Sequence, residues 1–424
     1  MFDLGMYGQY LASGVPIHLI SQDALTPSTL RTLRILWVGP VIDQSRFSNL
    51  AVSAAASIWQ QGLIEALVAA DQGVSIDVLS HLPCQAFPKG ALWPNAEETI
   101  FPQSVNGFGL RYLNLPKVRE WFLQWQYTRR LKQMLERQVN TPYDLIVSYN
   151  AEAYVSRPVA SVAKDRSLSW IAIIADLPKA QPQAYLIRAK VAQADGRIFL
   201  SWNNFITYAK PDQDLFLEGG VHSRTLDDSL NQVSQATLDE QSKIKRVAYF
   251  GGITPLGGID LFLEATRHVL GDQYEFHIIG TGDIARLETF AKRDSRIHYY
   301  GPVSQAQLIA IGHTIDVFVD PRPRAFSKNN FPSKILTYLG FAKPIISTLG
   351  HGIPPEYQQV LIELKKEDPL ALAQLLEATC AWDQERIAQY QLGTQALVTS
   401  SKSWQAQGKR VLSWMRSTIQ RQGA

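Results

Sequence analysis

The feature that most constrains this fold is an alternation that runs along almost the whole chain. Short apolar runs of strand length alternate with longer stretches whose apolar residues recur every three or four positions. Nearly continuous apolar strands separated by helices are typical of parallel sheets that helices cover on both faces. The sequence therefore predicts an α/β protein with doubly wound parallel sheets. We expect strands at residues 34–40, 74–80, 144–149, 169–175, 196–201, 246–252, 274–280, 296–300, 315–320 and 344–348.

The chain has 424 residues, which exceeds what one ordinary hydrophobic core accommodates. The polar segment 224–245 carries no strand signal and separates two series of strands, so we expect it to link two domains. The predicted order is an N-terminal extension (1–30), a Rossmann-like domain (31–223), the linker, a second Rossmann-like domain (246–395) and a closing helix (396–424). The carboxyl ends of both sheets should line the cleft between the domains, where such sheets bind ligands.

Composition and charge exclude several classes of protein. A hydrophobic fraction of 46% with 19% charged residues is typical of a well-packed domain, and a net charge of +3 argues against a nucleic-acid partner. Cys84 and Cys380 lie far apart, and the histidines form no ligand pair at helical spacing, so we expect neither a disulfide nor a metal site. There is no signal-peptide pattern and no run of eighteen apolar residues, which favours the cytoplasm.

Two glycine turns follow predicted strands in the second half. Gly251 and Gly252 follow the first of these strands, and Gly280 and Gly282 follow the next. Glycine lets the backbone approach a ligand closely, and free amides at a helix start favour phosphate. Each turn alone is a weak signal, because a strand–turn–helix junction without function has the same pattern.

Stronger anion signals follow the next two strands. Arg322 lies between two prolines in "DPRP", where a stiff backbone can present a guanidinium to a phosphate. In "FPSK", a proline suits the first helical turn, and the Ser333 amide and the Lys334 ammonium both favour negative charge. Helical spacing puts Lys334, Thr337, Tyr338 and Phe341 on one face. The two anion-binding groups together indicate a phosphate site.

These segments resemble a known family. "YFGGITPLGGIDLFLEA", "FHIIGTGD", "VDPRP", "FPSKILTYLGFAKPIIST" and "HGIPPEY" are similar, in this order, to the donor half of the retaining family-four glycosyltransferases of GT-B architecture. In the first half, "VGPVIDQSRFSNLAVSAAASIWQQGLIEAL", "AIIADLP" and "EGGVHSR" look like a branch that acts in polysaccharide assembly. The resemblance runs from about residue 34 to about residue 420.

The resemblance implies a nucleotide-diphosphate sugar as donor, a glycan or lipid-linked acceptor held by the first domain, and no cofactor or required metal. It places Gly251 and Gly252 near the diphosphate, with Arg322 and Lys334 neutralising the charge that develops as the glycosidic bond breaks. Asp176, in "ADLP", faces the cleft from the acceptor side. Arg46 and Asn49, on the loop after the first strand, are further candidates. For Asp176, capping of a local turn is an equally good reading.

The sequence departs from the family pattern at the sugar and ribose positions. The family's paired carboxylates correspond to Asn329 and Thr337 here, and an arginine and a lysine of the first glycine turn correspond to Gly252 and Gly257. A non-catalytic relative that binds a nucleotide, a glycan or a partner glycosyltransferase is therefore a second hypothesis. A sugar-nucleotide epimerase ranks last, because the carboxylates and histidines that it needs are not found.

Residues 111–137 form a basic, aromatic segment. Seven Lys or Arg stand against Glu120 and Glu136, with Trp121, Phe122 and Trp125 among them. Such a helix can lie on an anionic membrane. We favour the alternative, a solvated face over a core stripe, and expect weak membrane contact at most.

Overall fold

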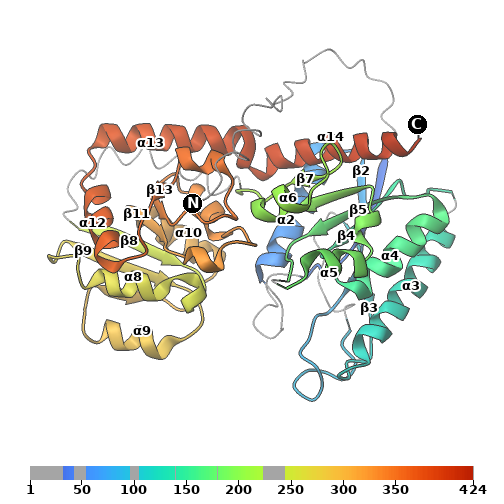
Figure 1. The fold of residues 1–424 in the computed structure, drawn as a ribbon, viewed down its shortest axis with the longest axis horizontal. Coiled ribbons are helices and arrows are strands. Elements are labelled where there is room, and N and C mark those ends of the chain that lie inside the picture. Colours follow the sequence, from blue (N-terminus) through green and yellow to red (C-terminus); the bar gives the residue numbers. More distant parts are fainter. Residues whose placement is uncertain are drawn as a thin grey trace, which may run out of the picture. The chain divides into compact units, whose positions relative to one another are not determined.

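Two parallel sheets form the centre of residues 33–424 in the computed structural model (Figure 1). The structure describes residues 32–42, 54–95, 105–138, 140–178, 180–222 and 244–423. The expected N-terminal extension lies outside these residues, as do the linker up to residue 243 and the candidate site residues Arg46 and Asn49. The last linker residue, Lys245, already belongs to a strand.

The first sheet has the strand order β3-β2-β1-β4-β5-β6-β7, and all its pairings are parallel. Its strands are β1 (Leu33–Val38), β2 (Val74–His81), β3 (Asn106–Leu110), β4 (Leu145–Tyr149), β5 (Ser169–Ile174), β6 (Gly196–Phe199) and β7 (Leu215–Phe216). The helices between them are α2 (Ala54–Ala70), α3 (Arg119–Arg137), α4 (Ala153–Arg166), α5 (Pro182–Arg188) and α6 (Trp202–Tyr208).

The second sheet has the order β10-β9-β8-β11-β12-β13 and is also parallel throughout. Its strands are β8 (Lys245–Phe250), β9 (Tyr274–Ile279), β10 (Ile297–Tyr299), β11 (Val317–Asp320), β12 (Ile345–Ser347) and β13 (Ile362–Glu363). Its helices include α8 (Ile259–Thr266), α9 (Ile284–Ala291), α10 (Gln305–Thr314), α11 (Lys334–Leu339) and α12 (Pro369–Cys380). In both sheets the strand order reverses as in a Rossmann fold. The reversal lies between β1 and β4 in the first sheet and between β8 and β11 in the second.

The predicted fold class is confirmed: two doubly wound parallel sheets. Each expected strand is present, and none of its ends is shifted by more than two residues. The sequence missed β3, β7 and β13. Strand β3 contains two glycines, and β7 and β13 are two residues long, so none of them has the apolar run that marks a central strand.

Burial on both faces explains why the strands are continuously apolar. In β1, Leu36 and Val38 pack into the core on one face of the first sheet, while Ile35 and Trp37 pack into the core on the other. The strands of the second sheet follow the same rule: Val247 and Tyr249 of β8 enter one core, and Ala248 and Phe250 enter the other. Successive side chains of a strand point to opposite faces, so both must be apolar when both faces are covered.

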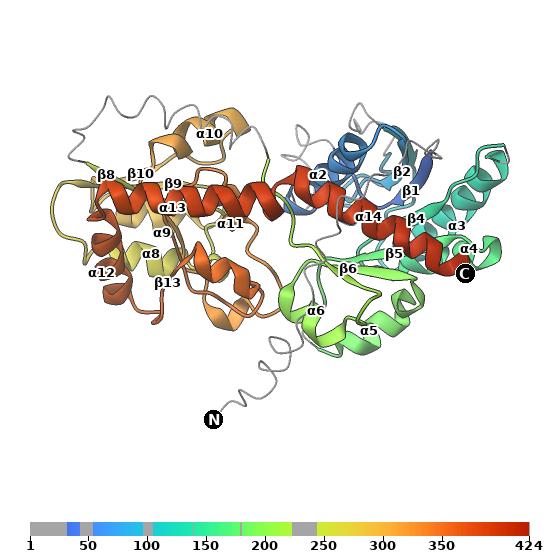
Figure 2. The same ribbon diagram turned by 90° about the horizontal axis from the view of Figure 1, so that it is seen from above.

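The last two helices serve different sheets. Helix α13 (Gln384–Leu397) lies beside the second sheet, where the Tyr390 hydroxyl accepts a hydrogen bond from the Ile345 amide of β12 at 3.2 Å. A π-helical turn (Val398–Lys402) follows, and α14 (Trp404–Gly423) then packs against α2 of the first domain (Figure 2). Trp404 and Met415 are buried in that core.

A buried ion pair fixes the point at which the chain crosses back. The Lys402 ammonium contacts the Glu218 carboxylate at 2.5 Å and Glu356 at 2.9 Å. The Tyr357 hydroxyl donates to the same Glu218 oxygen at 2.7 Å. Glu218 follows β7, whereas Glu356 and Tyr357 precede β13, so the pair joins segments of both domains to the π-helical turn.

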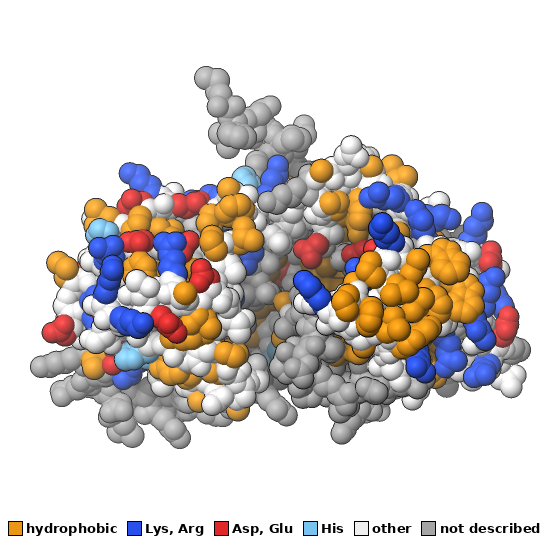
Figure 3. Space-filling model, turned by 90° about the horizontal axis from the view of Figure 1, so that it is seen from below, with side chains coloured by type: hydrophobic (Ala, Val, Ile, Leu, Met, Phe, Trp, Pro, Cys, Tyr) orange, Lys and Arg blue, Asp and Glu red, His pale blue; other side chains and the backbone are white. Residues whose placement is uncertain are grey.

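Helix α3 is amphipathic, but its outer face is not simply polar. Leu123, Tyr127, Leu131 and Met134 are buried against the first sheet, as the core-stripe reading predicts. Trp121 is nevertheless 69% exposed. Figure 3 shows a broad hydrophobic area with Lys and Arg side chains around it on this domain.

His81, the last residue of β2, is buried among three tyrosines. Its Nδ1 lies 2.7 Å from the Tyr127 hydroxyl, and the rings of Tyr112, Tyr127 and Tyr154 meet its ring edge to face. Burial, together with the nearby Arg119 charge, lowers the pKa of His81 from 6.5 to about 4. The ring is therefore neutral in the folded protein at neutral pH.

We predict that His81 makes stability depend on pH between 6.5 and 4. In this window the unfolded chain binds a proton at His81 that the folded chain does not, so the free energy of unfolding falls as pH falls. The full loss is about 3 kcal/mol. Urea unfolding at several pH values measures it. His81→Asn should flatten the profile and the exposed His351→Asn should not, so an unchanged slope in His81→Asn would contradict this assignment.

Candidate functional site

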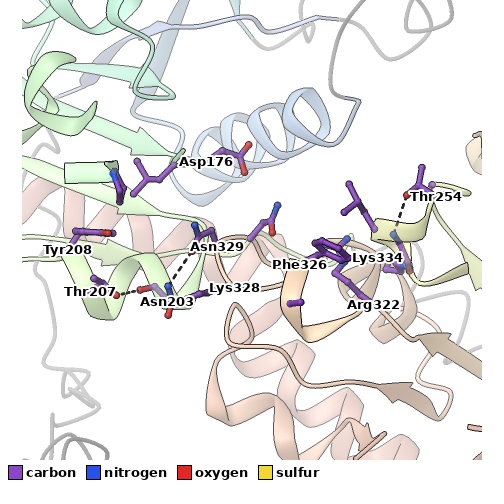
Figure 4. Close-up of a pocket in the computed structure, with 17 residues that line it drawn as sticks. Asp176, Asn203, Thr207, Tyr208, Thr254, Arg322, Phe326, Lys328, Asn329 and Lys334 are labelled. Atoms are coloured by element: carbon purple, nitrogen blue, oxygen red, sulfur yellow. Dashed lines mark hydrogen bonds between the residues drawn. The ribbon is translucent and has the colours of Figure 1, made fainter. Parts of the chain in front are cut away.

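A cavity of about 630 Å³ opens at the carboxyl ends of strands from both sheets (Figure 4). This volume is in the usual range for small-molecule sites. Its lining from the first domain is Asp176, Leu177, Pro182, Asn203, Thr207 and Tyr208, and from the second domain Gly252, Thr254, Leu256, Gly257, Arg322, Ala325, Phe326, Lys328, Asn329, Asn330 and Lys334. The cavity thus contains groups from both halves of the chain.

The second domain contributes two neighbouring strand ends. Gly252 follows β8 and Arg322 follows β11, and these two strands pair directly although sixty-odd residues separate them. The turn after β8 is fixed by the Tyr249 hydroxyl, which donates to the Gly252 carbonyl at 2.7 Å. A side chain at Gly258 would collide with the Pro321 carbonyl, so glycine there lets the turn pack closely against the "DPRP" segment. This is the switch point of the sheet, where such folds bind ligands.

Arg322 is a cation that the protein leaves available to a ligand. It is half-buried, lines the cavity, and its Nε is enclosed without a hydrogen-bond partner among the described residues. Arg324, two residues later, is tied up instead: its guanidinium pairs with Glu363 and Glu367 at 3.3 and 3.4 Å. An enclosed guanidinium donor without a partner calls for an anionic acceptor.

Lys334 also lines the cavity, but its charge is largely balanced by the protein. Its ammonium lies 3.0 Å from the Asp320 carboxylate, whose side chain is 1% exposed, and 4.0 Å from the centre of the Tyr249 ring. Burial lowers the pKa of Lys334, Asp320 opposes this shift, and the nearby Arg322 charge adds to it. The sequence analysis expected a free ammonium, and the structure shows one that is shared with a buried carboxylate.

The first domain faces these cations with Asp176 and helix α6. Asp176 follows β5 and is exposed towards the cavity, yet the protein around it raises the pKa of its carboxyl through desolvation. Asn203 of α6 donates to the Asn329 side chain at 3.4 Å, and Asn204 donates to the Asn329 carbonyl at 3.1 Å. Figure 4 shows Asn203 and Asn329 turned towards each other.

Five expected residues do not line the cavity: Gly251, Gly280, Gly282, Ser333 and Thr337. A Cβ at Gly280 would lie 1.8 Å from the Gly251 carbonyl oxygen, and one at Gly282 would lie 2.2 Å from that of Ile253. These two glycines are therefore explained by the close approach of the ends of β8 and β9. Ser333 is exposed and Thr337 is half-buried.

One expectation about α11 is wrong. Tyr338 and Phe341 are buried, at 0% and 1% exposure, and do not line the cavity with Lys334. The Tyr338 hydroxyl bonds to the backbone of Phe250 at the end of β8, accepting from its amide at 2.8 Å and donating to its carbonyl at 3.1 Å. Helix α11 is only six residues long and lies between core and cavity, so helical spacing alone did not separate its faces.

Several lining residues were not foreseen. Lys328 and Phe326 belong to the loop before α11, and Asn203, Thr207 and Tyr208 belong to α6. The one available signal was "SWNN", polar residues directly after the predicted strand at 196–201. Among the described residues there is no group of three or more His, Cys, Asp or Glu that could hold a metal. No helix in the described part of the chain is long and apolar enough to cross a membrane.

Comparison with known proteins agrees with this architecture. Residues 244–380 match the family of group 1 glycosyl transferases, a stretch that includes Gly252, Arg322 and Lys334. The fold is that of the GT-B glycosyltransferases. The resemblance to glycosyltransferases of GT-B architecture is thereby confirmed. A search of curated proteins gives no match.

Solved structures of this fold match nearly the full chain. A sucrose-phosphate synthase from Thermosynechococcus elongatus has a TM-score of 0.65 at 15% identity, covering 92% of this chain and 100% of its own. Anabaena HepE in complex with UDP has a TM-score of 0.61 at 14% identity, covering 91% and 100%. A glycosyltransferase from Rickettsia africae has 0.64 at 13%, covering 92% and 99%. At such low identity the likeness shows the fold alone.

We predict that Lys334→Met lowers the free energy of unfolding by about 3–5 kcal/mol, because it leaves the Asp320 carboxylate buried and unpaired. Asp320→Asn/Lys334→Met should recover part of this loss by removing the charge. Arg324→Met is the matched control, since a partly exposed ion pair contributes about 1 kcal/mol or less. Urea unfolding measures all three variants. If Lys334→Met were no less stable than Arg324→Met, the ion pair would not be a structural requirement.

Proposed function

We propose that the protein is a glycosyltransferase that moves a hexose from a nucleotide-diphosphate sugar to a glycan or lipid-linked acceptor, with retention at the anomeric carbon. The observation that carries this proposal is the single cavity in which Arg322 and Lys334 face Asp176. The fold supports it, as do the solved neighbours: HepE is known in complex with UDP-glucose, and starch synthase IV of Arabidopsis thaliana with ADP and acarbose. We assign the reaction to polysaccharide or glycoconjugate assembly in the cytoplasm.

In the proposed reaction the diphosphate lies at the switch point of the second sheet. The bond between the anomeric carbon and the diphosphate oxygen breaks, and its electron pair leaves with the diphosphate. Arg322, with Lys334 and Lys328 beside it, stabilises the negative charge that develops there. Arg322 contributes most, because the described residues leave its Nε unpaired while Asp320 already balances Lys334.

Asp176 is proposed to orient the acceptor. Its carboxylate accepts a hydrogen bond from the acceptor hydroxyl, whose oxygen then bonds to the anomeric carbon. Retention requires attack from the face that the diphosphate leaves, so the hydroxyl proton passes to the departing diphosphate oxygen. The proposed reaction uses no metal or organic cofactor. Since desolvation raises the pKa of Asp176, we expect activity to rise with pH as this carboxyl ionises.

One observation favours a second candidate, a non-catalytic protein that binds a nucleotide, a glycan or a partner glycosyltransferase. Asp176 is the only carboxylate among the described residues that line the cavity. Asn329 stands where the family resemblance implies a carboxylate and is bonded to α6, while Thr337 lies outside the lining. Charged acceptors hold ribose and sugar hydroxyls more strongly than neutral ones, so donor binding would be weak.

We predict that Arg322→Ala weakens nucleoside-diphosphate binding roughly tenfold or more, because a hydrogen bond to a charged group contributes on the order of 1.5–3 kcal/mol. Titration calorimetry with UDP, ADP and inorganic pyrophosphate measures this change. The affinity for all three ligands should fall by a similar factor. Arg324→Ala is the control, as its guanidinium is held by Glu363 and Glu367 outside the cavity. Equal affinities in parent and Arg322→Ala would place the nucleotide elsewhere.

A separate prediction distinguishes the two candidates. Asp176→Asn should reduce sugar transfer about a hundredfold, because the acceptor hydroxyl is no longer held in the reactive position, while the nucleotide affinity stays within twofold. Release of nucleoside diphosphate from a panel of sugar nucleotides, with and without acceptor glycans, is the measurement. Nucleotide binding without turnover in the parent protein would favour the non-catalytic candidate instead.

A further inference from the structure

Five apolar side chains at one end of the first domain are exposed together, although each could have been buried in a core. They are Phe87 (41% exposed), Trp93 (45%), Val118 (41%), Trp121 (69%) and Trp125 (44%). We call them the aromatic patch. Figure 3 shows this domain with a continuous hydrophobic area. Large exposed apolar patches that are rimmed by polar residues mark interaction sites.

The aromatic patch is built on a fixed scaffold. Asn114 is fully buried and ties down the loop that carries Phe87 and Trp93: its amide donates to the Leu92 carbonyl at 2.9 Å, and its carbonyl accepts from the Phe87 amide at 3.0 Å. Its side chain donates to the carbonyls of Gln85 and Ala91. The rings of Trp93 and Phe122 meet edge to face at 6.0 Å, and so this loop is joined to α3.

Helix α3 exposes these aromatic residues on the face opposite its core stripe. Val118, Trp121 and Trp125 are spaced three and four apart, so they lie along one line. The buried residues Leu123 and Tyr127 lie on the other side. The first sheet therefore does not need Trp121 or Trp125 for its own packing.

Positive charge is concentrated around the aromatic patch. Residues 82–137 contain eight Lys or Arg and four Glu, a net charge of +4, whereas the whole chain has a net charge of only +3. The guanidinium of Arg111 lies 5.7 Å from the Trp93 ring centre, and that of Arg129 lies 5.6 Å from the Trp125 ring centre. Lys89, Lys117 and Lys132 are exposed nearby in the sequence.

We infer that the aromatic patch and its basic rim dock the protein onto the surface of an anionic phospholipid bilayer. Tryptophan rings prefer the interface between headgroups and acyl chains, and Lys and Arg next to them reach the lipid phosphates. Each basic residue near an anionic surface adds an attraction on the order of 1 kcal/mol. A protein partner would need an acidic surface with pockets that match the aromatic rings. An anionic bilayer offers negative headgroups and an apolar interior to a patch of any shape. The sequence analysis had favoured a solvated face, and the exposed tryptophans reverse that preference.

The position of α3 relates membrane docking to the proposed sugar transfer. This part of the inference rests on the proposed function. Desolvation raises the pKa of Glu152, and the charges of Glu120, in the first turn of α3, and of Asp176 raise it further. The start of α3 is therefore electrostatically close to the acceptor side of the cavity. A lipid-linked acceptor held in the same bilayer would reach Asp176 without leaving the membrane.

Vesicle co-sedimentation with the full chain tests the docking and needs no sugar donor or acceptor. Binding should be strong to vesicles that contain phosphatidylglycerol, weak to pure phosphatidylcholine, and should fall as salt rises. Trp121→Ala and the charge reversal Arg129→Glu/Lys132→Glu should each reduce the partition coefficient roughly tenfold. Matched controls on the second domain are Leu392→Ala, 68% exposed in the parent, and Lys365→Glu/Lys366→Glu, and both should bind as the parent does.

Three outcomes would overturn the inference. Either no binding to anionic vesicles or binding unaffected by Trp121→Ala and the charge reversal would exclude the aromatic patch as a membrane surface. A parent protein that sediments as a dimer, and becomes a monomer in Trp121→Ala, would assign the aromatic patch to a second copy of the chain. Because Trp121 is mostly exposed, urea unfolding of Trp121→Ala should match that of the parent and confirm that the variant is folded. Loss of sugar transfer with intact vesicle binding would count against the proposed function alone.

Discussion

Parallel pairing of the strands is the constraint on which the rest of this structure depends. A parallel strand cannot turn back directly, so each one is followed by a crossover, and all the carboxyl ends of a sheet meet at one edge. In the second sheet this brings the ends of β8 and β11 side by side, with Gly252 at one and Arg322 at the other. The residues that follow β5 and β6 of the first sheet, Asp176 and α6, line the same cavity. The candidate site is thus a direct consequence of sheet topology.

The cations of the site differ in how far the protein has already neutralised them. Lys334 pairs with Asp320, whose carboxylate is buried and cannot be solvated. This lysine therefore stabilises the fold, in addition to any role in binding a ligand. Arg322 lacks such a partner among the described residues at its Nε. The same contrast separates Arg322 from Arg324, which Glu363 and Glu367 hold. A buried charge needs a partner, and among these cations Arg322 has a donor that the described protein groups do not satisfy.

The first domain contributes one side of the cavity and also carries the aromatic patch, and these two surfaces are built differently. The cavity contains few charges, and each is placed by the end of a strand or by a fixed loop. The aromatic patch instead combines a helix with a loop that Asn114 holds in place, and it presents apolar rings inside a basic rim. Helix α3 contributes to the core of the domain with one face and to the aromatic patch with the other. The proposed membrane surface and the side of the cavity that holds Asp176 thus belong to the same domain.

The sequence alone determined the fold class, because continuous apolar strands between helices have few other solutions than two-sided parallel sheets. It also indicated Asp176 and Arg322, which follow recognisable strands, and Lys334, which begins a helix, and all three line one cavity. Only the tertiary structure decided which partners these groups have. Asp320 is fourteen positions from Lys334, and Asn204 is 125 from Asn329. The spacing of residues along the chain does not predict such long-range pairs. It predicts which residues share a face of a helix, but not which face a sheet will cover. For that reason the sequence grouped Tyr338 with the ligand-facing residues of α11, although it is buried.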